Sequence, residues 1–420
     1  MNRDLAIDAT RGLAIWSMIS LHFAAGTVIA VPTHSFPFVD GMSAFVLLSG
    51  LVLGLVYRRW IDRYSLGYAY RRLARRLVVL YVCQVAIALV AVAAALAGHR
   101  WLTLLLPVDG WGDGILQSLA LHYLPSGGNI LRLYLVLMAS AFIVIPLLAR
   151  GSWRFVLLAS LALYALSQFA APEWTYLTSA MESPRTENWA AWQVLFVPAL
   201  VVGWNWQRWQ VARLIDRLLP VLVVAAAGVW LAFHFLIVDG PLADREAVLA
   251  DKVDLGPVRA IGAWLVVPTI YGIFRLLMRR RDVARVFRPL VMTGGRSLDS
   301  YVLQAIALVV VPIHVAHRPW DLGTTAAVVL LVFGACWGWA ELRRAWGIDK
   351  LHRLPAILAE RGRRAATTST ATATRGRGTG SATVTAAPAE SPNATAAHDR
   401  VPRQPDSHAV PSPSLSRSGL

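Results

Sequence analysis

One arginine and one histidine lie eleven residues apart in the first apolar run of the chain, Arg11 and His22. Eleven residues of α-helix span about 16 Å and about 1100° of rotation, so the two side chains share one helix face. Asp8 lies one turn before Arg11 on that face. Ionisable groups at membrane depth are costly and usually face a cavity or a partner group. The spacing therefore predicts a functional site here, although a topology-setting Arg11 and an interhelical hydrogen bond from His22 would give the same pattern.

Composition favours a membrane protein. The chain has 420 residues, of which 56% are hydrophobic and 15% charged. Several apolar runs of about twenty residues predict transmembrane helices. The net charge of +16 would suit a nucleic-acid partner, but the arginines cluster between apolar runs and in the C-terminal part, which favours the cytoplasmic face of a bilayer. Cys83 and Cys336 lie inside apolar runs without partner spacing, so we expect neither a disulfide nor a metal site.

The apolar runs predict an all-α fold, a polytopic membrane bundle of about ten transmembrane helices. The expected helices cover approximately 13–30, 38–57, 77–97, 130–149, 155–171, 189–206, 218–238, 259–278, 290–313 and 322–341. The stretch between Gly98 and Gly128 is rich in Trp, Gly and Pro and reads as a re-entrant or interfacial segment. We expect residues 1–358 to form the membrane domain. Residues 359–420, rich in Ala, Thr, Ser, Pro and Arg without apolar periodicity, predict a disordered cytoplasmic tail.

Arginine clusters occur in every second connector between the expected helices. The positive-inside rule therefore predicts a multi-pass plasma-membrane protein with both termini in the cytoplasm. The cluster before the third helix is the densest, and it contains Arg71, Arg72, Arg75 and Arg76. These residues would serve as a topology signal, or they would form an anion site at a helix end for a phosphorylated cofactor.

Five segments resemble, in the same order, those of OpgC-type proteins of the membrane acyltransferase-3 superfamily, and the spacing of Arg11 and His22 resembles that superfamily's first-helix signature. The five segments are Asp8–Ala14, Phe45–Arg59, Leu133–Leu137, Ala191–Val197 and Gly295–Leu298. The resemblance covers about residues 1–345. It departs at Gln304, where we would expect a histidine or a similar group, so no role is carried over to this position.

The resemblance implies an integral-membrane O-acyltransferase without a metal. Such an enzyme moves an acyl group, for example succinyl or acetyl, from cytoplasmic acyl-CoA to a hydroxyl of an extracytoplasmic glycan. In this interpretation Arg11 and the cluster Arg71, Arg72, Arg75 and Arg76 bind the phosphates of acyl-CoA. Asp8 orients Arg11, and His22 accepts the proton of the acceptor hydroxyl or carries the acyl group. A phosphopantetheine arm of roughly 15–20 Å would match the distance along the helix from Arg11 to His22.

Four further residues are candidates for substrate contact. Asp40 is the acidic residue of the first outer loop. Ser49 would donate to an oxyanion, or it would allow close helix packing as a small residue. Trp192 and Gln193, near the outer end of the sixth expected helix, would contact a sugar or anchor the helix at the interface.

Two other classes of function stay open. A secondary transporter would share the helices and the buried ionisable groups, and should show inverted repeats with broken midplane helices. A lipid-linked-sugar glycosyltransferase would need acidic residues in its first outer loop, where the sequence offers Asp40.

The alternation of arginine-rich and arginine-poor connectors predicts on which side of the membrane a fused reporter will be located. Fusions of a compartment-sensitive reporter after Arg59 and after Lys350 should both report the cytoplasm. A fusion at either position that reports the outside would overturn the assignment.

Overall fold

The computed structural model describes residues 4–34, 36, 38–98, 108–125, 129–178, 185–238, 240–311 and 321–347, all of them within one unit, Met1–Asp349. The predicted tail at 359–420 and part of the stretch from Gly98 to Gly128 lie outside these ranges. The rest of that stretch contains a short helix, α5.

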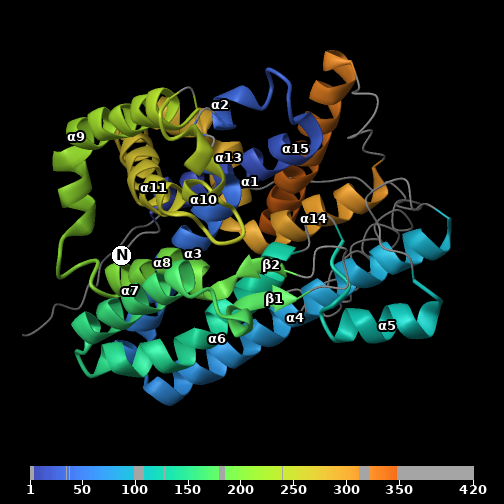
Figure 1. The fold of residues 1–420 in the computed structure, drawn as a ribbon, viewed down its shortest axis with the longest axis horizontal. Helices are drawn as coiled ribbons and strands as arrows, with labels where there is room; N and C mark the ends of the chain where they lie inside the picture. Colours follow the sequence, from blue (N-terminus) through green and yellow to red (C-terminus); the bar gives the residue numbers. More distant parts are fainter. Residues whose placement is uncertain are drawn as a thin grey trace, which may run out of the picture. The chain divides into compact units, whose positions relative to one another are not determined.

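The described residues are almost entirely helical, which confirms the all-α class (Figure 1). The helices are α1 (Leu5–Ala24), α2 (Val31–His34), α3 (Gly41–Arg63), α4 (Leu66–Leu96), α5 (Trp111–Leu119), α6 (Asn129–Ala149), α7 (Trp153–Phe169), α8 (Trp189–Trp204), α9 (Val211–Ala232), α10 (Glu246–Leu249), α11 (Pro257–Leu277), α12 (Arg281–Val286), α13 (Arg288–Gly295), α14 (Ser297–Val310) and α15 (Leu322–Ala345). A π-helical turn, Phe233–Val238, extends α9. A small antiparallel hairpin, β1 (Tyr176–Thr178) and β2 (Arg185–Asn188), precedes α8.

Each predicted apolar segment coincides with a helix, but several boundaries were wrong, and three of them have a clear local cause. The first helix begins at Leu5 rather than near residue 13, because the Asp4 side chain caps it by accepting from the Ala6 N–H at 3.0 Å. Ser65 caps α4 in the same way, so the basic stretch expected as a connector is the first part of a helix. The ninth expected helix is two helices, α13 and α14, which meet at Arg296 after a pair of glycines with low helix propensity.

Several helices have the length and composition of membrane spans. Within the described residues, six are long and apolar enough to cross a bilayer: α3, α4, α6, α9 with its extension, α11 and α15. Three shorter apolar helices, α7, α8 and α14, accompany them. These helices are consistent with a membrane protein, and the count of ten spans stays a prediction.

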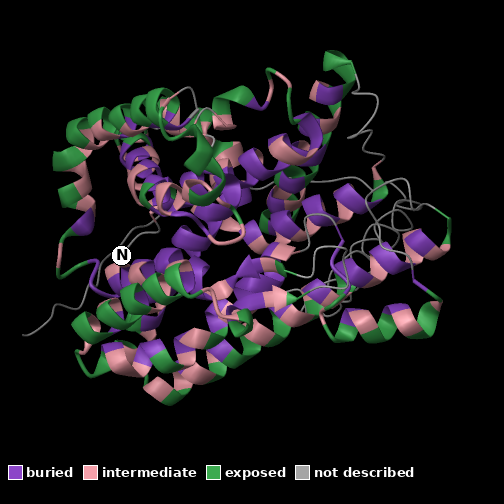
Figure 2. Ribbon diagram, viewed as in Figure 1, coloured by how far each residue is buried: buried purple, intermediate pink, exposed green. Residues whose placement is uncertain are grey.

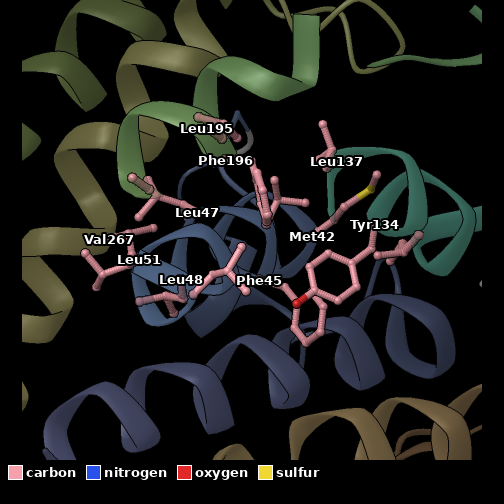
Figure 3. Close-up of a cluster of buried hydrophobic side chains, with 14 of the residues drawn as sticks. Met42, Phe45, Leu47, Leu48, Leu51, Tyr134, Leu137, Leu195, Phe196 and Val267 are labelled. Atoms are coloured by element: carbon pink, nitrogen blue, oxygen red, sulfur yellow. The ribbon is translucent and has the colours of Figure 1, made fainter. Parts of the chain in front are cut away.

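The core lies where α3 packs against α1, α6 and α8. Figure 2 shows α8 and the inner part of α3 mostly buried, whereas α5 and α9 present largely exposed residues. Figure 3 shows Phe45 of α3 beside Tyr134 of α6, with Phe196 of α8 nearby. The ring centroids of Phe45 and Tyr134 are 5.9 Å apart, and those of Tyr134 and Phe196 are 6.2 Å apart. Aromatic packing therefore joins these three helices at the centre of the bundle.

Two helix pairs approach to backbone contact through glycine. In the pair α3 and α8, a Cβ atom at Gly50 would overlap the carbonyl oxygen of Phe196, and one at Gly203 would overlap that of Leu51. In the pair α1 and α13, a Cβ atom at Gly12 would overlap the carbonyl oxygen of Leu290. Small residues allow such close packing in membrane helices, where the hydrophobic effect between helices is weak.

The close contact of α3 with α8 predicts a strong effect of a single methyl group. Gly50→Ala should lower the stability of the purified protein by about 1–3 kcal/mol, because the helices must separate to accommodate the Cβ atom. The matched control is Gly228→Ala in α9, whose Cβ atom would meet nothing within 4 Å. The control should leave stability unchanged or slightly raised, since alanine favours helix over glycine. Thermal unfolding in detergent measures both, and equal midpoints for the two variants would contradict the packing argument.

Candidate functional site

A small polar pocket lies at the end of α1 that carries His22. It has a volume of about 30 Å³, and His22, Asp40, Asn129 and Lys252 provide its polar lining. A cavity of this size with several polar partners has room for a water molecule or a hydroxyl group. The first residues of α3 and of α6 also line the pocket. The positive ends of two helix dipoles therefore point toward the space beside His22.

His22 is half-buried, and its Nδ1 atom makes no regular hydrogen bond with a described residue, although the Met18 carbonyl one turn earlier lies beside it. Asp40 and Lys252 are both near enough to act electrostatically on the imidazole. The structure thus brings together two predicted site residues, His22 and Asp40, that are eighteen positions apart in the sequence.

Asp40 is the N-cap of α3. Its Oδ1 accepts from the Ser43 N–H at 2.8 Å and from the Ser43 hydroxyl at 2.9 Å, and its Oδ2 lies 3.5 Å from Lys252 Nζ. Burial disfavours the charged carboxylate, but Lys252, the Ser43 N–H and Arg259 outweigh this effect and hold the pKa of Asp40 below its usual value. Asp40 is therefore charged at neutral pH, and its stabilising effect is lost only as the pH falls through that lowered pKa.

Trp192 holds the backbone of the loop that carries Lys252. The fully buried indole Nε1 of Trp192 lies 3.2 Å from the Lys252 carbonyl and 3.3 Å from that of Val253. The backbone N–H of Asn188 also donates to the Val253 carbonyl at 3.0 Å. Trp192 therefore fixes the loop that carries Lys252 and does not itself line the pocket.

Gln193 faces α7 and not the pocket. It accepts from the Ser160 hydroxyl at 2.6 Å and donates to the carbonyl oxygens of Ser160 and Ala190. Ser49 is also away from the pocket lining. Its hydroxyl is buried without a hydrogen-bond partner among the described residues, and the neighbouring Gly50 forms the contact with α8.

Arg11 lies in the interior near the opposite end of α1. Its Nη2 donates to the Ser297 hydroxyl of α14 at 2.5 Å, and its guanidinium lies 6.0 Å from the Phe45 ring centroid. Asp8 is buried one turn earlier on the same helix, at the point where Gly294 of α13 makes backbone contact.

Gln304 of α14 lies between the two ends of the α1 face. Its Nε2 is 3.9 Å from the sulfur of Met18, and its Oε1 is buried without a partner among the described residues. Met18 lies on the same helix face as Arg11 and His22. Gln304 thus supplies an unused polar atom partway along that face.

The four arginines at the start of α4 divide into two pairs. Arg71 and Arg75 are exposed. Arg72 packs against Trp60 of α3 and against Tyr68 one turn earlier in α4, and its Nε donates to the Tyr68 hydroxyl at 2.9 Å. Arg76 interacts with Tyr134 of α6. Since Tyr134 packs on Phe45 and Phe45 on Arg11, Arg76 and Arg11 approach the same aromatic pair from different helices.

Sequence reasoning missed a polar cluster beside the His22 pocket. Asn129 donates to Glu187 Oε1 at 2.5 Å, and Arg132 Nη2 lies 3.9 Å from Glu187 Oε2. Glu187 and Arg132 are 3% and 5% exposed, so this is a buried ion pair. Arg132 also donates to Thr186 and to the Thr178 carbonyl, which ties α6 to the hairpin. The available signal was Arg132, a charge two residues inside an expected helix.

The family model described as OpgC protein matches residues 3–347, which is most of the chain. No curated protein and no solved structure matches it.

The double role of Asp40 as cap and ion-pair partner predicts different effects of two substitutions. Asp40→Ala should lower stability by about 1 kcal/mol, because the first N–H groups of α3 lose their acceptor. Asp40→Asn should be close to the parent, because asparagine caps helices as well as aspartate and because an ion pair with a half-exposed lysine contributes little. Thermal unfolding at neutral pH measures both. An equal loss in the two variants would show that the charge, rather than the cap, carries the stabilisation.

Proposed function

The chain belongs to the OpgC protein family, and on that basis we propose that it transfers an acyl group from acyl-CoA to a hydroxyl group of a glucan across the membrane. The family implies a transferase that modifies glucans. The observation that carries the finer proposal is the single helix α1, which holds a buried cation, Arg11, at one end and a titratable imidazole, His22, in a polar pocket at the other. The two positions are separated by about 16 Å of helix.

Acyl-CoA binding is proposed at the Arg11 end. Arg11, Arg72 and Arg76 supply positive charge from α1 and α4, and arginine suits phosphate because its guanidinium donates two parallel hydrogen bonds. Arg71 and Arg75 are exposed and would contribute only to the attractive potential at this end. A pantetheine arm that extends along α1 from Arg11 to His22 would pass Gln304. The buried Oε1 of Gln304 has no hydrogen-bond partner among the described residues. A polar chain such as pantetheine would satisfy that oxygen through its amide groups.

Acceptor activation is proposed at His22. The imidazole takes the proton of the acceptor hydroxyl while that oxygen attacks the thioester carbon. The carbon–sulfur bond then breaks, and the departing thiolate takes up the proton. Asp40, charged at neutral pH, favours the imidazolium formed in between, whereas Lys252 disfavours it and so favours return of the proton. The N-terminal ends of α3 and α6 favour the negative charge that develops on the thioester oxygen. A covalent acyl-imidazole is the variant of this route in which His22 attacks first.

The central test is the loss of the imidazole. His22→Ala should lower the rate of glucan acylation by about 10² to 10⁴, the usual contribution of a general base, or by more if His22 carries the acyl group. The matched control is His234→Ala, an exposed histidine after α9. Acylation is measured with purified protein, labelled acyl-CoA and glucan, after confirming equal insertion and monodispersity. Parental activity in His22→Ala would contradict the proposal.

Substitution of Arg11 should mainly affect KM for acyl-CoA, whereas substitution of His22 should mainly affect the rate of acylation. Arg11→Ala should raise KM for acyl-CoA more than it lowers kcat, because it removes a contact to the donor and not to the reacting atoms. Arg11→Lys should rescue only in part, since an ammonium group cannot donate in the bidentate manner. Steady-state kinetics at varied acyl-CoA separates the two constants. Full rescue by lysine would show that charge alone is required.

A further inference from the structure

A second and larger cavity lies where the C-terminal end of α3 meets the end of α8. It has a volume of about 300 Å³, at the lower end of the range for small-molecule sites. Trp204 and Trp206 line it and are each 6% exposed, whereas Arg58, Arg59 and Arg208 line it and are exposed. The cavity therefore has buried aromatic walls and a cationic rim.

Arginines outnumber acidic residues in the lining of this cavity. Asp62 is its one acidic lining residue, against three arginines. Arg58 Nε donates to Asp62 Oδ2 at 2.8 Å, and its guanidinium lies 5.1 Å from the Trp204 ring centroid. The terminal nitrogens of Arg58 donate to no described residue, and Arg208 makes no ion pair with any residue that the structure describes. The rim thus retains donors for a ligand with negative charge.

The cavity is distinct from the arginines proposed to bind acyl-CoA. Tyr57 and Trp60 of α3 face Arg76 and Arg72 of α4. Arg58 lies against Trp204 of α8 instead, on another face of the same helix. Close packing through Gly203, which contacts the Leu51 carbonyl, holds α3 and α8 together directly beside the cavity. The cavity is therefore bounded by two elements whose separation is fixed.

We propose that this cavity binds an anionic organic phosphate. Guanidinium groups bind phosphate through charge-assisted hydrogen bonds. The indole rings offer an apolar wall for the organic part of the ligand, which inorganic phosphate lacks. A nucleotide phosphate and an anionic phospholipid headgroup both have this chemistry. Binding is independent of the acyl-transfer proposal, because neither His22 nor Arg11 lines the cavity.

Direct binding measurements test the proposal. The purified full chain in detergent is titrated by calorimetry with adenosine 3′,5′-bisphosphate, and separately with a short-chain phosphatidylglycerol below its micellar concentration. Short-chain phosphatidylcholine is the neutral control. At least one anionic probe should bind, more weakly at high salt. Arg58→Gln and Arg208→Gln should each weaken binding about tenfold or more. The matched control is Arg213→Gln, an exposed arginine of α9 that donates to Gln210, and it should bind like the parent.

Each outcome decides the question. Binding of the nucleotide alone identifies a nucleotide site, and binding of phosphatidylglycerol alone identifies a lipid site. Either result supports an organic-phosphate site if Arg58→Gln and Arg208→Gln lose affinity for that probe and Arg213→Gln does not. The proposal is overturned if neither anionic probe binds, if phosphatidylcholine binds equally well, or if Arg58→Gln and Arg208→Gln bind as tightly as Arg213→Gln. His22→Ala should bind the same probe normally, so failure of acyl transfer and failure of this site are distinguishable.

Discussion

Backbone contact between α1 and α13 is the constraint on which the proposed site depends. Gly12 and Gly294 let the two helices meet without intervening side chains, next to Asp8 and Arg11. This contact fixes the depth and rotation of α1, and a helix fixed in rotation presents Arg11 and His22 along one line. Tyr271 of α11 adds a hydrogen bond to Asp4, the cap of α1, at 2.8 Å. A rotation of α1 by one residue would turn both side chains away from their partners.

The two ends of α1 differ in the chemistry that surrounds them. At the Arg11 end, the surroundings include the buried Asp8, the Ser297 hydroxyl and aromatic rings, with further arginines on α4. At the His22 end, they are carboxylate, ammonium and amide groups, with helix N-termini beside them. The first environment favours an anion, and the second favours proton transfer and developing negative charge. This division suits a reaction in which donor and acceptor arrive from different sides.

Sequence patterns predicted the elements better than the contacts between them. Apolar periodicity located the helices, and the spacing of Arg11 and His22 identified the shared face. Side-chain caps at Asp4 and Ser65 shifted two helix starts, because a cap competes with any boundary read from hydropathy. Lys252 and Glu187 escaped prediction because Lys252 lies in a loop and Glu187 in the short strand β2, both outside the apolar helices. Their positions depend on tertiary hydrogen bonds through Trp192 and Asn129. Such long-range pairing has no periodic signal in a single sequence.

Transfer across the bilayer is the central claim of this account, and proteoliposomes measure it most directly. Purified protein is reconstituted in one orientation, with labelled acyl-CoA on the side of the Arg11 end and glucan on the side of the His22 end. The account predicts labelled glucan in this arrangement and almost none when both substrates are confined to the Arg11 side. Equal labelling with both substrates on that one side would contradict it, because the two ends of α1 would then not serve different compartments.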